Sequence, residues 1–484
     1  MKKIQSLRAI FDTPMHRRSF LLGSMALPLA ACGGGGGSSG TAPPPSQLAA
    51  TIRFSQTTSG ALLDSNYAGL SYEKTRINLF NPGNTNLINL FQLLGNNILR
   101  LGGNTTDETS LNGQIPGTTA INQSQLSNLA TFLQATGWKV LYGINLAGSN
   151  QTPNPTNARQ EAQAVATTLG SSLLGFEIGN EPDLYVSDQN YRAPGWGYSN
   201  FLSEWYSLAN TIKTAAPGIP LTGPASAHNY QQFTNPFAHD AANSISTLTH
   251  HYYIANGQDP ASTISKMLQP DLNLTKILQS VTQSAAAASI GFRMAECNSF
   301  YDGGSAGVSN SYASALWVLD YLFTCAMSQC QGVNLHGGGG SLYSALTDNG
   351  TTITSVNPLF YGIMLFSLAA QGRAYHVDLS VNDPSANFSA YGVSRNDGGQ
   401  NILIINKDSS RASQTTVQFA SNIRNVRQWT LSGPSLNSLT GTQLNGTPIS
   451  ISGSWSNTPS SLTTNSGSLA INIPPISAIL LQST

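Results

Sequence analysis

Between residues 66 and 372 the sequence alternates short apolar runs with stretches of helical periodicity, and this alternation constrains the fold most strongly. Strands that alternate with helices indicate a parallel sheet, and eight such units indicate a closed barrel. The strand-like runs are 67–73, 97–101, 139–146, 173–178, 220–224, 248–253, 292–295 and 332–336. The helical stretches between them include 123–136, 158–169, 199–216, 309–328 and 359–371. We therefore predict an α/β fold with a (β/α)8 barrel over residues 66–372.

Residues 373–484 have a different pattern, in which short alternating runs are separated by Ser, Asn, Gly and Pro. The runs include 401–406, 416–419, 428–431 and 469–473. This pattern predicts an antiparallel β-sandwich domain. The segment 50–65 begins with a run of the same character and precedes the first barrel run. We expect it to join the sandwich and so to connect the two domains.

The first 32 residues have the pattern of an export signal. Arg17-Arg18 lies just ahead of an apolar run, as in twin-arginine signals. Residues 29–32 resemble a lipobox in which Cys32 is lipidated; the alternative is cleavage near residue 31 and release. Residues 33–49 are a Gly/Ser/Pro linker of the kind that tethers a domain. We expect an exported, lipid-anchored monomer, periplasmic or on the cell surface.

The charge of the chain excludes some partners. Charged residues make up only 9% of the sequence, and 22 Lys and Arg balance 22 Asp and Glu. The first 32 residues hold five of the bases and one of the acids, so the rest of the chain has an acidic excess of four. This balance argues against nucleic acid as a partner. We expect contact with a membrane only through the lipid anchor.

Cysteine usage is uninformative about metals. Apart from Cys32, the chain holds Cys297, Cys325 and Cys330, and no Cys/His spacing resembles a metal site. Cys325 and Cys330 either pair in an oxidising compartment or pack as small core residues of one helix. We expect neither a metal nor another cofactor.

Two glutamates follow strand-like runs that are far apart in the sequence. Pro182 cannot extend a central strand, so Asn180 and Glu181 lie where the fourth run leaves the sheet. Glu296 lies at the exit of the seventh run, 292–295. In such barrels the C-terminal ends of the strands carry the active site, and two carboxylates are the minimum for cleaving a glycosidic bond. The alternative for 180–182 is a plain capped turn.

The motifs around these glutamates are similar to those of a known family. An Asn-Glu-Pro at the fourth strand and a Glu at the seventh resemble the large clan of retaining (β/α)8 glycosidases. The segments ILRLGGNTTD, FEIGNEPDLY, THHYYI, AECNSFYDGG and VNLHGGGG resemble glycoside hydrolase family 79, which contains β-glucuronidases and heparanases. The resemblance implies a barrel-plus-sandwich plan from about residue 50 to the end.

The resemblance and the residue chemistry together suggest roles for the site residues. Glu181 is the expected acid/base and Glu296 the expected nucleophile, and an ionised Glu296 raises the pKa of Glu181 by repulsion. We expect Arg100 to keep Glu296 ionised. Asn180 resembles the clan asparagine that binds the sugar 2-hydroxyl. Glu177 shares strand parity with Glu181, and we expect an ion pair there, with Arg100 as a candidate partner.

The expected substrate contacts rest on the same resemblance, which implies that tyrosine hydroxyls and glycine amides hold a uronate. The matching residues are Tyr252, Tyr301, Gly303, Gly304 and Tyr343. The alternative for 303–304 is a plain loop.

Asp302 stands where heparanases carry a glycine, and we expect its side chain to point away from the substrate. Glu73 and Asn104 are expected contacts to sugar hydroxyls. We expect His250, His251 and His336 to be core or supporting residues.

These features predict a retaining β-glucuronidase that removes terminal glucuronic acid from a glycan or glycoside. An endo-acting, heparanase-like hydrolase is the alternative within the enzyme class. A sugar-binding lipoprotein without catalytic activity is the alternative outside it. The expected partner is in every case a carbohydrate.

Overall fold

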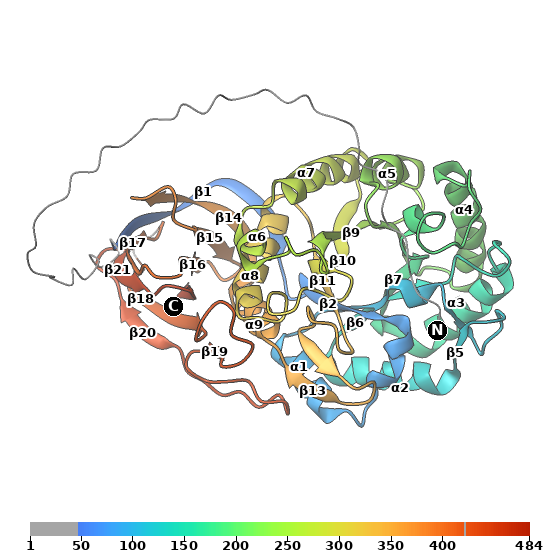
Figure 1. The fold of residues 1–484 in the computed structure, drawn as a ribbon, viewed down its shortest axis with the longest axis horizontal. Helices are drawn as coiled ribbons and strands as arrows, with labels where there is room; N and C mark the ends of the chain where they lie inside the picture. Colours follow the sequence, from blue (N-terminus) through green and yellow to red (C-terminus); the bar gives the residue numbers. More distant parts are fainter. Residues whose placement is uncertain (1–46, 421–422) are drawn as a thin grey trace, which may run out of the picture. The chain divides into compact units, whose positions relative to one another are not determined.

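The structure is a computed structural model that describes residues 47–420 and 423–484. In this part of the chain, eight parallel strands close into a barrel in the order β10-β11-β2-β3-β6-β7-β8-β9 (Figure 1). The strands are β2 (Ala68–Glu73), β3 (Ile98–Gly102), β6 (Lys139–Ile144), β7 (Leu173–Ile178), β8 (Leu221–Ser226), β9 (Thr247–Asn256), β10 (Gly291–Tyr301) and β11 (Val333–Gly337). The predicted closed barrel is confirmed, with β7 as its fourth strand and β10 as its seventh.

Helices connect successive barrel strands and cover the outside of the barrel (Figure 1). They are α1 (Thr85–Leu93), α2 (Gln123–Thr136), α3 (Pro155–Leu169), α4 (Tyr198–Ala215), α5 (Asn235–Asp240), α6 (Ile264–Leu268), α7 (Leu272–Ala287), α8 (Ala313–Met327) and α9 (Pro358–Ala369). Polar side chains cap the N-termini of α1, α2, α3, α6 and α7. Asn122 and Gln125 form a reciprocal capping box at the start of α2, and Gly137 ends that helix at φ 73°.

Beside the barrel lies a second sheet, with ten strands in the described part of the chain. They are β1 (Leu48–Leu63), β14 (Gly372–Val381), β15 (Phe388–Arg395), β16 (Gln400–Asn406), β17 (Ser413–Gln418), β18 (Asn425–Ser432), β19 (Gln443–Leu444), β20 (Ser460–Thr463), β21 (Ser468–Ile473) and β22 (Ser477–Ser483). Strand β1 pairs antiparallel with β14 and parallel with β17. The N-terminal strand therefore contributes to this sheet, as predicted.

The ten-stranded sheet folds over on itself to enclose a small core. Side chains of β1, β17 and β21, such as Ile52 and Val417, cluster with those of β16, β18 and β22, such as Ile402 and Ile479. The opposite faces of β16 and β22 contribute Leu403 and Leu480 to the larger core shared with the barrel helices. Both strands are therefore buried on both faces and read as continuous apolar runs, whereas β1 begins with strict alternation.

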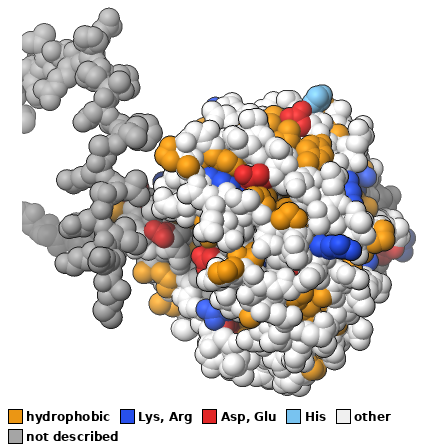
Figure 2. Space-filling view, turned by 90° about the vertical axis from the view of Figure 1, so that its right-hand side faces the viewer, with side chains coloured by type: hydrophobic (Ala, Val, Ile, Leu, Met, Phe, Trp, Pro, Cys, Tyr) orange, Lys and Arg blue, Asp and Glu red, His pale blue; other side chains and the backbone are white. Residues whose placement is uncertain are grey.

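Two further sheets have two strands each. One pairs β4 (Thr109–Leu111) with β5 (Thr119–Ile121), and the other pairs β12 (Leu346–Asp348) with β13 (Ile353–Val356). Cys297, Cys325 and Cys330 are buried free thiols. Charged side chains appear as isolated spots on the face shown in Figure 2.

Several sequence predictions lie outside the described residues, namely the export signal, Cys32 and the linker up to residue 46. Among residues 47–420 and 423–484, no helix combines the length and the apolar character that crossing a bilayer requires.

Candidate active site

Glu181 occupies a strained backbone position just beyond β7. Its φ of 52° and ψ of 54° place it in the left-handed region, which a residue with a side chain rarely adopts. Gly179 has a φ of 80°, and Pro182 begins a 3-10 turn, η4 (Pro182–Leu184), so the strand ends sharply here. The Glu181 side chain reaches His251 on β9, whose Nδ1 lies 2.9 Å from Oε1.

Glu296 lies within β10 rather than at its exit, which corrects the predicted strand end at residue 295. Pairing with β9 continues as far as Tyr301, so the strand is longer than its apolar run. Met294 pairs with His250 and Glu296 with His251, which leaves Ala295 as an extra residue. This bulge re-aims the strand next to the glutamate, as bulges near functional sites commonly do.

Hydrogen bonds and cations hold the Glu296 carboxylate. The Tyr253 hydroxyl donates to Oε1 at 2.9 Å, and Nη1 of Arg100 donates to Oε2 at 2.6 Å. The Nδ1 of His336 lies 3.7 Å from Oε2. Burial alone raises the pKa of Glu296, but His336 and Arg100 and the Tyr253 hydrogen bond bring that pKa well below its usual range. Glu296 is therefore a carboxylate that stays ionised.

Glu181 has the opposite electrostatic environment. Burial raises its pKa well above the usual value, and the negative charges of Glu296 and Asp183 raise it further. Its hydrogen-bond partner His251 is a neutral imidazole, because burial lowers the pKa of that histidine to about 4. The pKa of Glu181 is therefore raised and that of Glu296 is lowered. Such a difference indicates that Glu181 is the acid and Glu296 the anion.

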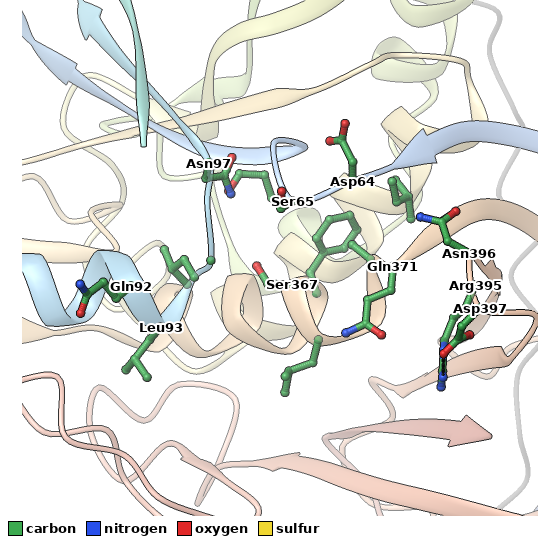
Figure 3. A pocket seen from close by; sticks show the side chains of 17 residues that line it. Asp64, Ser65, Gln92, Leu93, Asn97, Ser367, Gln371, Arg395, Asn396 and Asp397 are labelled. Atoms are coloured by element: carbon green, nitrogen blue, oxygen red, sulfur yellow. Dashed lines mark hydrogen bonds and ion pairs between the residues drawn. The ribbon is translucent and has the colours of Figure 1, made fainter. Parts of the chain in front are cut away.

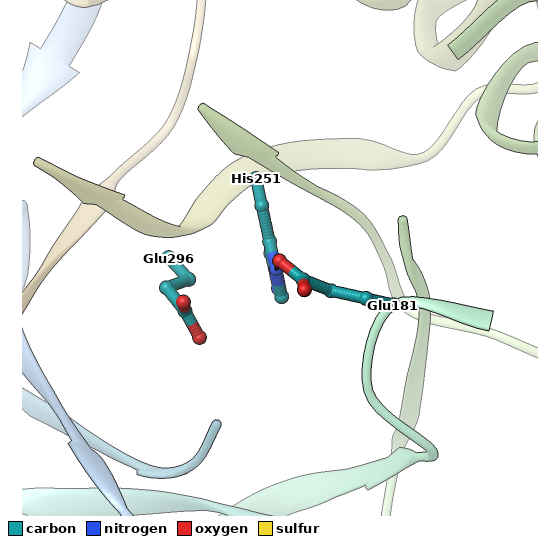
Figure 4. A group of neighbouring side chains, drawn as sticks. All are labelled: Glu181, His251 and Glu296. Atoms are coloured by element: carbon teal, nitrogen blue, oxygen red, sulfur yellow. Dashed lines mark hydrogen bonds and ion pairs between the residues drawn. The ribbon is translucent and has the colours of Figure 1, made fainter. Parts of the chain in front are cut away.

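The two carboxylates face each other across a small gap (Figure 4). One oxygen each of Glu181 and Glu296 and one ring nitrogen of His251 all lie within 4.8 Å of one another. Within the described ranges, this is the one group of three His, Cys, Asp or Glu residues close enough to share a metal ion. The guanidinium of Arg100 against Glu296 disfavours such an ion, because it would repel a cation.

Arg100 lies at the centre of a buried network on the barrel axis. Its Nε donates to Oε2 of Glu177 at 2.6 Å, and its Nη2 donates to Oδ1 of Asn180 at 2.9 Å. With the bond to Glu296, one guanidinium joins the strands β3, β7 and β10. Glu177 is thus an ion-paired partner of Arg100.

Asn180 and Asn104 lie side by side at the same end of the barrel. The Nδ2 of Asn180 donates to Oδ1 of Asn104 at 3.1 Å, while its backbone amide donates to Asp107. Asn104 is exposed and also accepts from Gln189 at 3.4 Å. These two carboxamides form a polar wall next to Glu181.

Glu73 and Tyr343 lie on the other side of Glu296. Glu73 accepts hydrogen bonds from the backbone amide and hydroxyl of Thr105, and its Oε1 lies 3.6 Å from Nε2 of His336. The Tyr343 ring is 6.0 Å from that of Tyr253 and 6.1 Å from that of His336. Both predicted contacts therefore lie beside the nucleophile candidate.

Tyr252 does not reach the site, and this prediction is wrong. Side chains alternate along β9, so His251 and Tyr253 point into the barrel while Tyr252 points outward. There the Tyr252 hydroxyl bonds Asp271 at the start of α7, and its ring stacks on Tyr321 of α8. Of these two tyrosines, Tyr253 is the one whose hydroxyl reaches Glu296.

The loop after β10 combines left-handed backbone with open space. Asp302, Gly303 and Gly304 have successive φ values of 64°, 82° and 90°. A side chain added at Gly303 would meet nothing within 4 Å, whereas Gly304 packs against Gly257. Asp302 is exposed, and Tyr301 is 38% exposed beside the rings of His228 and Tyr253.

Three site residues went unrecognised in the sequence. Strand parity places His251 and Tyr253 on one face of β9, but it does not tell which face points into the barrel. Asp107, by contrast, gives no signal of its own, because its partners come from distant loops. His250 packs away from the site, where its Nδ1 lies 3.0 Å from the Thr234 hydroxyl.

A cavity of about 630 Å³ lies at the opposite end of the barrel (Figure 3). It is bordered by the starts of β2 and β3, the end of α9 and the turn at Arg395 and Asp397, which pair with each other. Active sites of such barrels lie at the C-terminal ends of the strands. The glutamate gap, not this cavity, is therefore the candidate active site.

A parallel barrel with two inward-facing glutamates of opposed pKa, joined to an antiparallel sheet domain, defines a glycoside hydrolase of the barrel type. The chain belongs to glycosyl hydrolase family 79, because residues 66–323 match the N-terminal domain of that family.

Similar proteins carry related names. The chain is 26% identical over 359 residues to a β-glucuronidase of Aspergillus niger, and the match covers 65% of each protein. It is 25% identical over 317 residues to a β-glucuronidase of Neurospora crassa, and that match covers 56% of each protein. The match thus spans less than two thirds of these relatives. A 4-O-α-L-rhamnosyl-β-D-glucuronidase structure from Fusarium oxysporum 12S superposes with a TM-score of 0.74 at 18% identity, covering 89% of this chain and 99% of that one. This likeness shows the fold.

Proposed function

We propose that this protein is a retaining exo-β-glucuronidase that hydrolyses terminal β-linked glucuronic acid. The observation that carries the mechanism is the gap between the two glutamates, whose nearest ligand oxygens lie within 4.8 Å. Retaining enzymes hold their carboxyl groups about 5–5.5 Å apart, whereas inverting enzymes need about 6.5–9.5 Å to fit a water. The short separation favours direct attack by one glutamate on the sugar.

In the first step, Glu296 attacks the anomeric carbon and forms a glycosyl ester. Glu181 gives its proton to the departing oxygen, so the glycosidic C–O bond breaks without release of an alkoxide. The raised pKa of Glu181 keeps it protonated, and the lowered pKa of Glu296 keeps it nucleophilic. His251 bonds Oε1 of Glu181, which leaves the other oxygen to hold the transferred proton.

In the second step, water attacks the ester and Glu181 takes the proton from that water. Formation of the ester removes the negative charge of Glu296, which is one cause of the raised pKa of Glu181. The pKa of Glu181 then falls, and the same residue changes from acid to base. Hydrolysis restores both carboxyl groups and releases glucuronic acid with retained configuration.

Asn180 is the proposed contact to the sugar 2-hydroxyl. Its Oδ1 is held by Arg100 and its Nδ2 points to Asn104, so its orientation is fixed before the substrate arrives. A contact of this type strengthens in the transition state and adds to catalysis. Glu73 and Asn104 are the proposed contacts to further hydroxyls.

The proposed uronate pocket is formed by the loop after β10 together with Tyr343 and Tyr301. The amides of Gly303 and Gly304 have no hydrogen-bond acceptor among the described residues, and successive backbone amides in a turn form concave anion sites. Asp302 is exposed, in keeping with a side chain that avoids the uronate. The names of the fungal relatives support the same substrate class.

The test compares 4-nitrophenyl β-glucuronide with 4-nitrophenyl β-glucoside under the same conditions. We expect a much larger kcat/KM for the glucuronide, and faster turnover of the glucoside would refute the uronate assignment. Proton NMR of the first product distinguishes retention from inversion. A 2-fluoro-glucuronide should label Glu296, and label on another residue would contradict its role. Digestion of a glucuronate-ended oligosaccharide separates exo from endo action by the size of the first product.

We also propose that the protein is an exported lipoprotein anchored at Cys32. The support is the Arg17-Arg18 pattern and the lipobox-like residues 29–32. Metabolic labelling with palmitate in a bacterial host tests this, and Cys32→Ala should abolish the label. Unchanged labelling of that variant would contradict the anchor.

A further inference from the structure

Glu181 and Ala225 both have strained, left-handed backbone, and a hydrogen bond joins them. The amide of Glu181, at φ 52°, donates to the carbonyl of Ala225 at 2.9 Å, and Ala225 has a φ of 56°. Each such residue costs on the order of 1–2 kcal/mol relative to right-handed backbone. Strain of this kind persists only where surrounding contacts determine the conformation.

Asp107 supplies such contacts from the loop after β3. Its Oδ1 accepts from the amides of Leu146 at 2.7 Å and Ala147 at 3.0 Å. Its Oδ2 accepts from the amide of Asn180 at 3.0 Å and from the hydroxyl of Tyr185 at 2.6 Å. One carboxyl group therefore ties the ends of β6 and β7 and the turn η4 to the end of β3.

Asp107 has no ion-pair partner and no access to a ligand. Its relative exposure is 3%, and among the described residues no Lys, Arg or His lies within ion-pair distance of it. Its partner Tyr185 is itself fixed, with its ring 5.5 Å from that of Trp196 and 5.5 Å from the Arg192 guanidinium. Both carboxyl oxygens of Asp107 are thus occupied by donors from the loops after β6 and β7.

Asp183 makes a matching set of contacts beyond Glu181. It accepts from three successive amides after β8: those of Ala227, His228 and Asn229, at 2.8–3.0 Å. Hydrogen bonds therefore fix the chain on both sides of Glu181. Asp107 holds the amide of Asn180, one residue before it, and the side chain of Asp183, two residues after it, is held by the amides after β8.

We propose that Asp107 is a positioning residue, which holds Asn180 and the left-handed Glu181 so that the acid/base carboxyl faces Glu296. This role rests on the proposed function of Glu181. Asp107 acts through the backbone of its neighbours and takes no part in bond making. Without it, relaxation of Glu181 towards right-handed backbone would turn the carboxyl away from the departing oxygen.

The direct test is Asp107→Asn, which keeps the shape of the side chain. It replaces one carboxyl oxygen, which accepts two hydrogen bonds, with an NH2 group that cannot accept them. We expect kcat/KM for a poor leaving group, methyl β-glucuronide, to fall about 100-fold, in the range of a lost general acid. The first step with 2,4-dinitrophenyl β-glucuronide, which needs no proton, should change less than about tenfold. Azide should speed turnover of that substrate and yield glucuronyl azide, because a small anion needs no base.

Two further variants separate positioning from loss of stability. Tyr185→Phe removes one donor to Asp107 and should give the same dependence on the leaving group, only weaker. Asp320→Asn is the matched control, because Asp320 on α8 accepts from Ser389, Tyr391 and Lys407 far from the gap. We expect it to lower the melting temperature but to leave the ratio of the two kcat/KM values unchanged.

The outcomes distinguish this proposal from the proposed function. If the wild type hydrolyses neither glucuronide, the function is wrong. If the wild type is active but kcat/KM of Asp107→Asn falls by the same factor for both substrates, the positioning role is overturned. The role is also overturned if this variant produces no glucuronyl azide with azide. Should Asp107→Asn fail to fold, Tyr185→Phe decides, and a leaving-group ratio equal to that of the wild type overturns the role.

Discussion

The Nη1 atom of Arg100 lies 2.6 Å from Oε2 of Glu296, while the Nε atom of the same guanidinium lies 2.6 Å from Oε2 of Glu177. All three side chains are at most 8% exposed, so one buried cation pairs with two buried carboxylates. The fork of Arg100 reaches both because its donors diverge in a fixed plane. Loss of this cation affects catalysis and stability together.

Replacing Arg100 by Lys should therefore be damaging, although the charge is kept. A lysine ammonium cannot meet Glu177, Asn180 and Glu296 at once, and breaking a buried pair costs about 3–5 kcal/mol. We expect a free energy of unfolding lower by about 3 kcal/mol in urea titration and a kcat/KM lower by at least about 100-fold. Arg411→Lys in the sheet domain is the control. Wild-type kinetics in Arg100→Lys would show that the fork is dispensable.

Tyr253→Phe and Tyr252→Phe form a matched pair of neighbouring variants. Tyr253→Phe removes a hydrogen bond to Glu296, worth about 1.5–3 kcal/mol for a charged acceptor, so kcat/KM should fall about tenfold or more. The pKa of Glu296 rises in this variant, and the acid limb of the pH profile moves to higher pH. Tyr252→Phe loses its bond to Asp271 and should reduce stability only. The same acid limb in both variants would contradict the assignment.

The pH dependence of the wild type follows from the two glutamates. Glu296 must be ionised, so activity falls as the pH drops through its lowered pKa. Glu181 must be protonated, so activity falls as the pH rises through its raised pKa. We expect the profile of kcat/KM to be broad on the acidic side, with the alkaline limb set by Glu181.

Charge coupling between the glutamates gives a separate prediction. Glu296→Gln removes the negative charge that helps to raise the pKa of Glu181, so this pKa should fall. Carbon-13 NMR titration of labelled glutamate side chains, compared with a Glu181→Gln spectrum for assignment, measures it. A Glu181 pKa that is the same with and without Glu296 would exclude direct coupling across the gap.

Lys74 and Glu161 give a stability prediction away from the chemistry. Their Nζ and Oε1 atoms lie 2.7 Å apart with both side chains fully buried, and the Tyr142 hydroxyl also donates to Glu161. Lys74→Met leaves a buried carboxylate without a cation, which costs about 3–5 kcal/mol. We expect a markedly lower melting temperature, partly recovered by adding Glu161→Gln. A melting temperature within a degree of the wild type would show that the pair contributes little.

Local sequence was enough to place the acid/base candidate. An apolar run that ends at Ile178 and a proline at 182 fix the end of a buried strand, because Pro cannot continue the hydrogen-bond ladder. Glu296 was found by the same reasoning, but its strand extends to Tyr301, since pairing with β9 outlasts the apolar run. Strand length in a sheet depends on the partner strand, which the local sequence does not contain.

The choice between Tyr252 and Tyr253 shows where the reasoning failed. Two adjacent tyrosines after a histidine pair are equivalent in composition, and only their parity relative to the barrel interior separates them. That parity depends on the bulges that shift the register between β8, β9 and β10. A shift of one residue exchanges the inward and outward faces.

The sequence by itself determined the alternation of strands and helices, the strand end that carries Glu181, and the domain that β1 joins. These are consequences of apolar periodicity and of what proline and glycine permit within a few residues. Only the tertiary structure decided that Arg100 lies between Glu177 and Glu296, that Tyr253 rather than Tyr252 meets the nucleophile candidate, and that Asp107 accepts from the amide of Asn180. Those contacts join residues between 43 and 196 positions apart in the sequence. The register and curvature of the whole barrel, rather than local preference, bring such residues together.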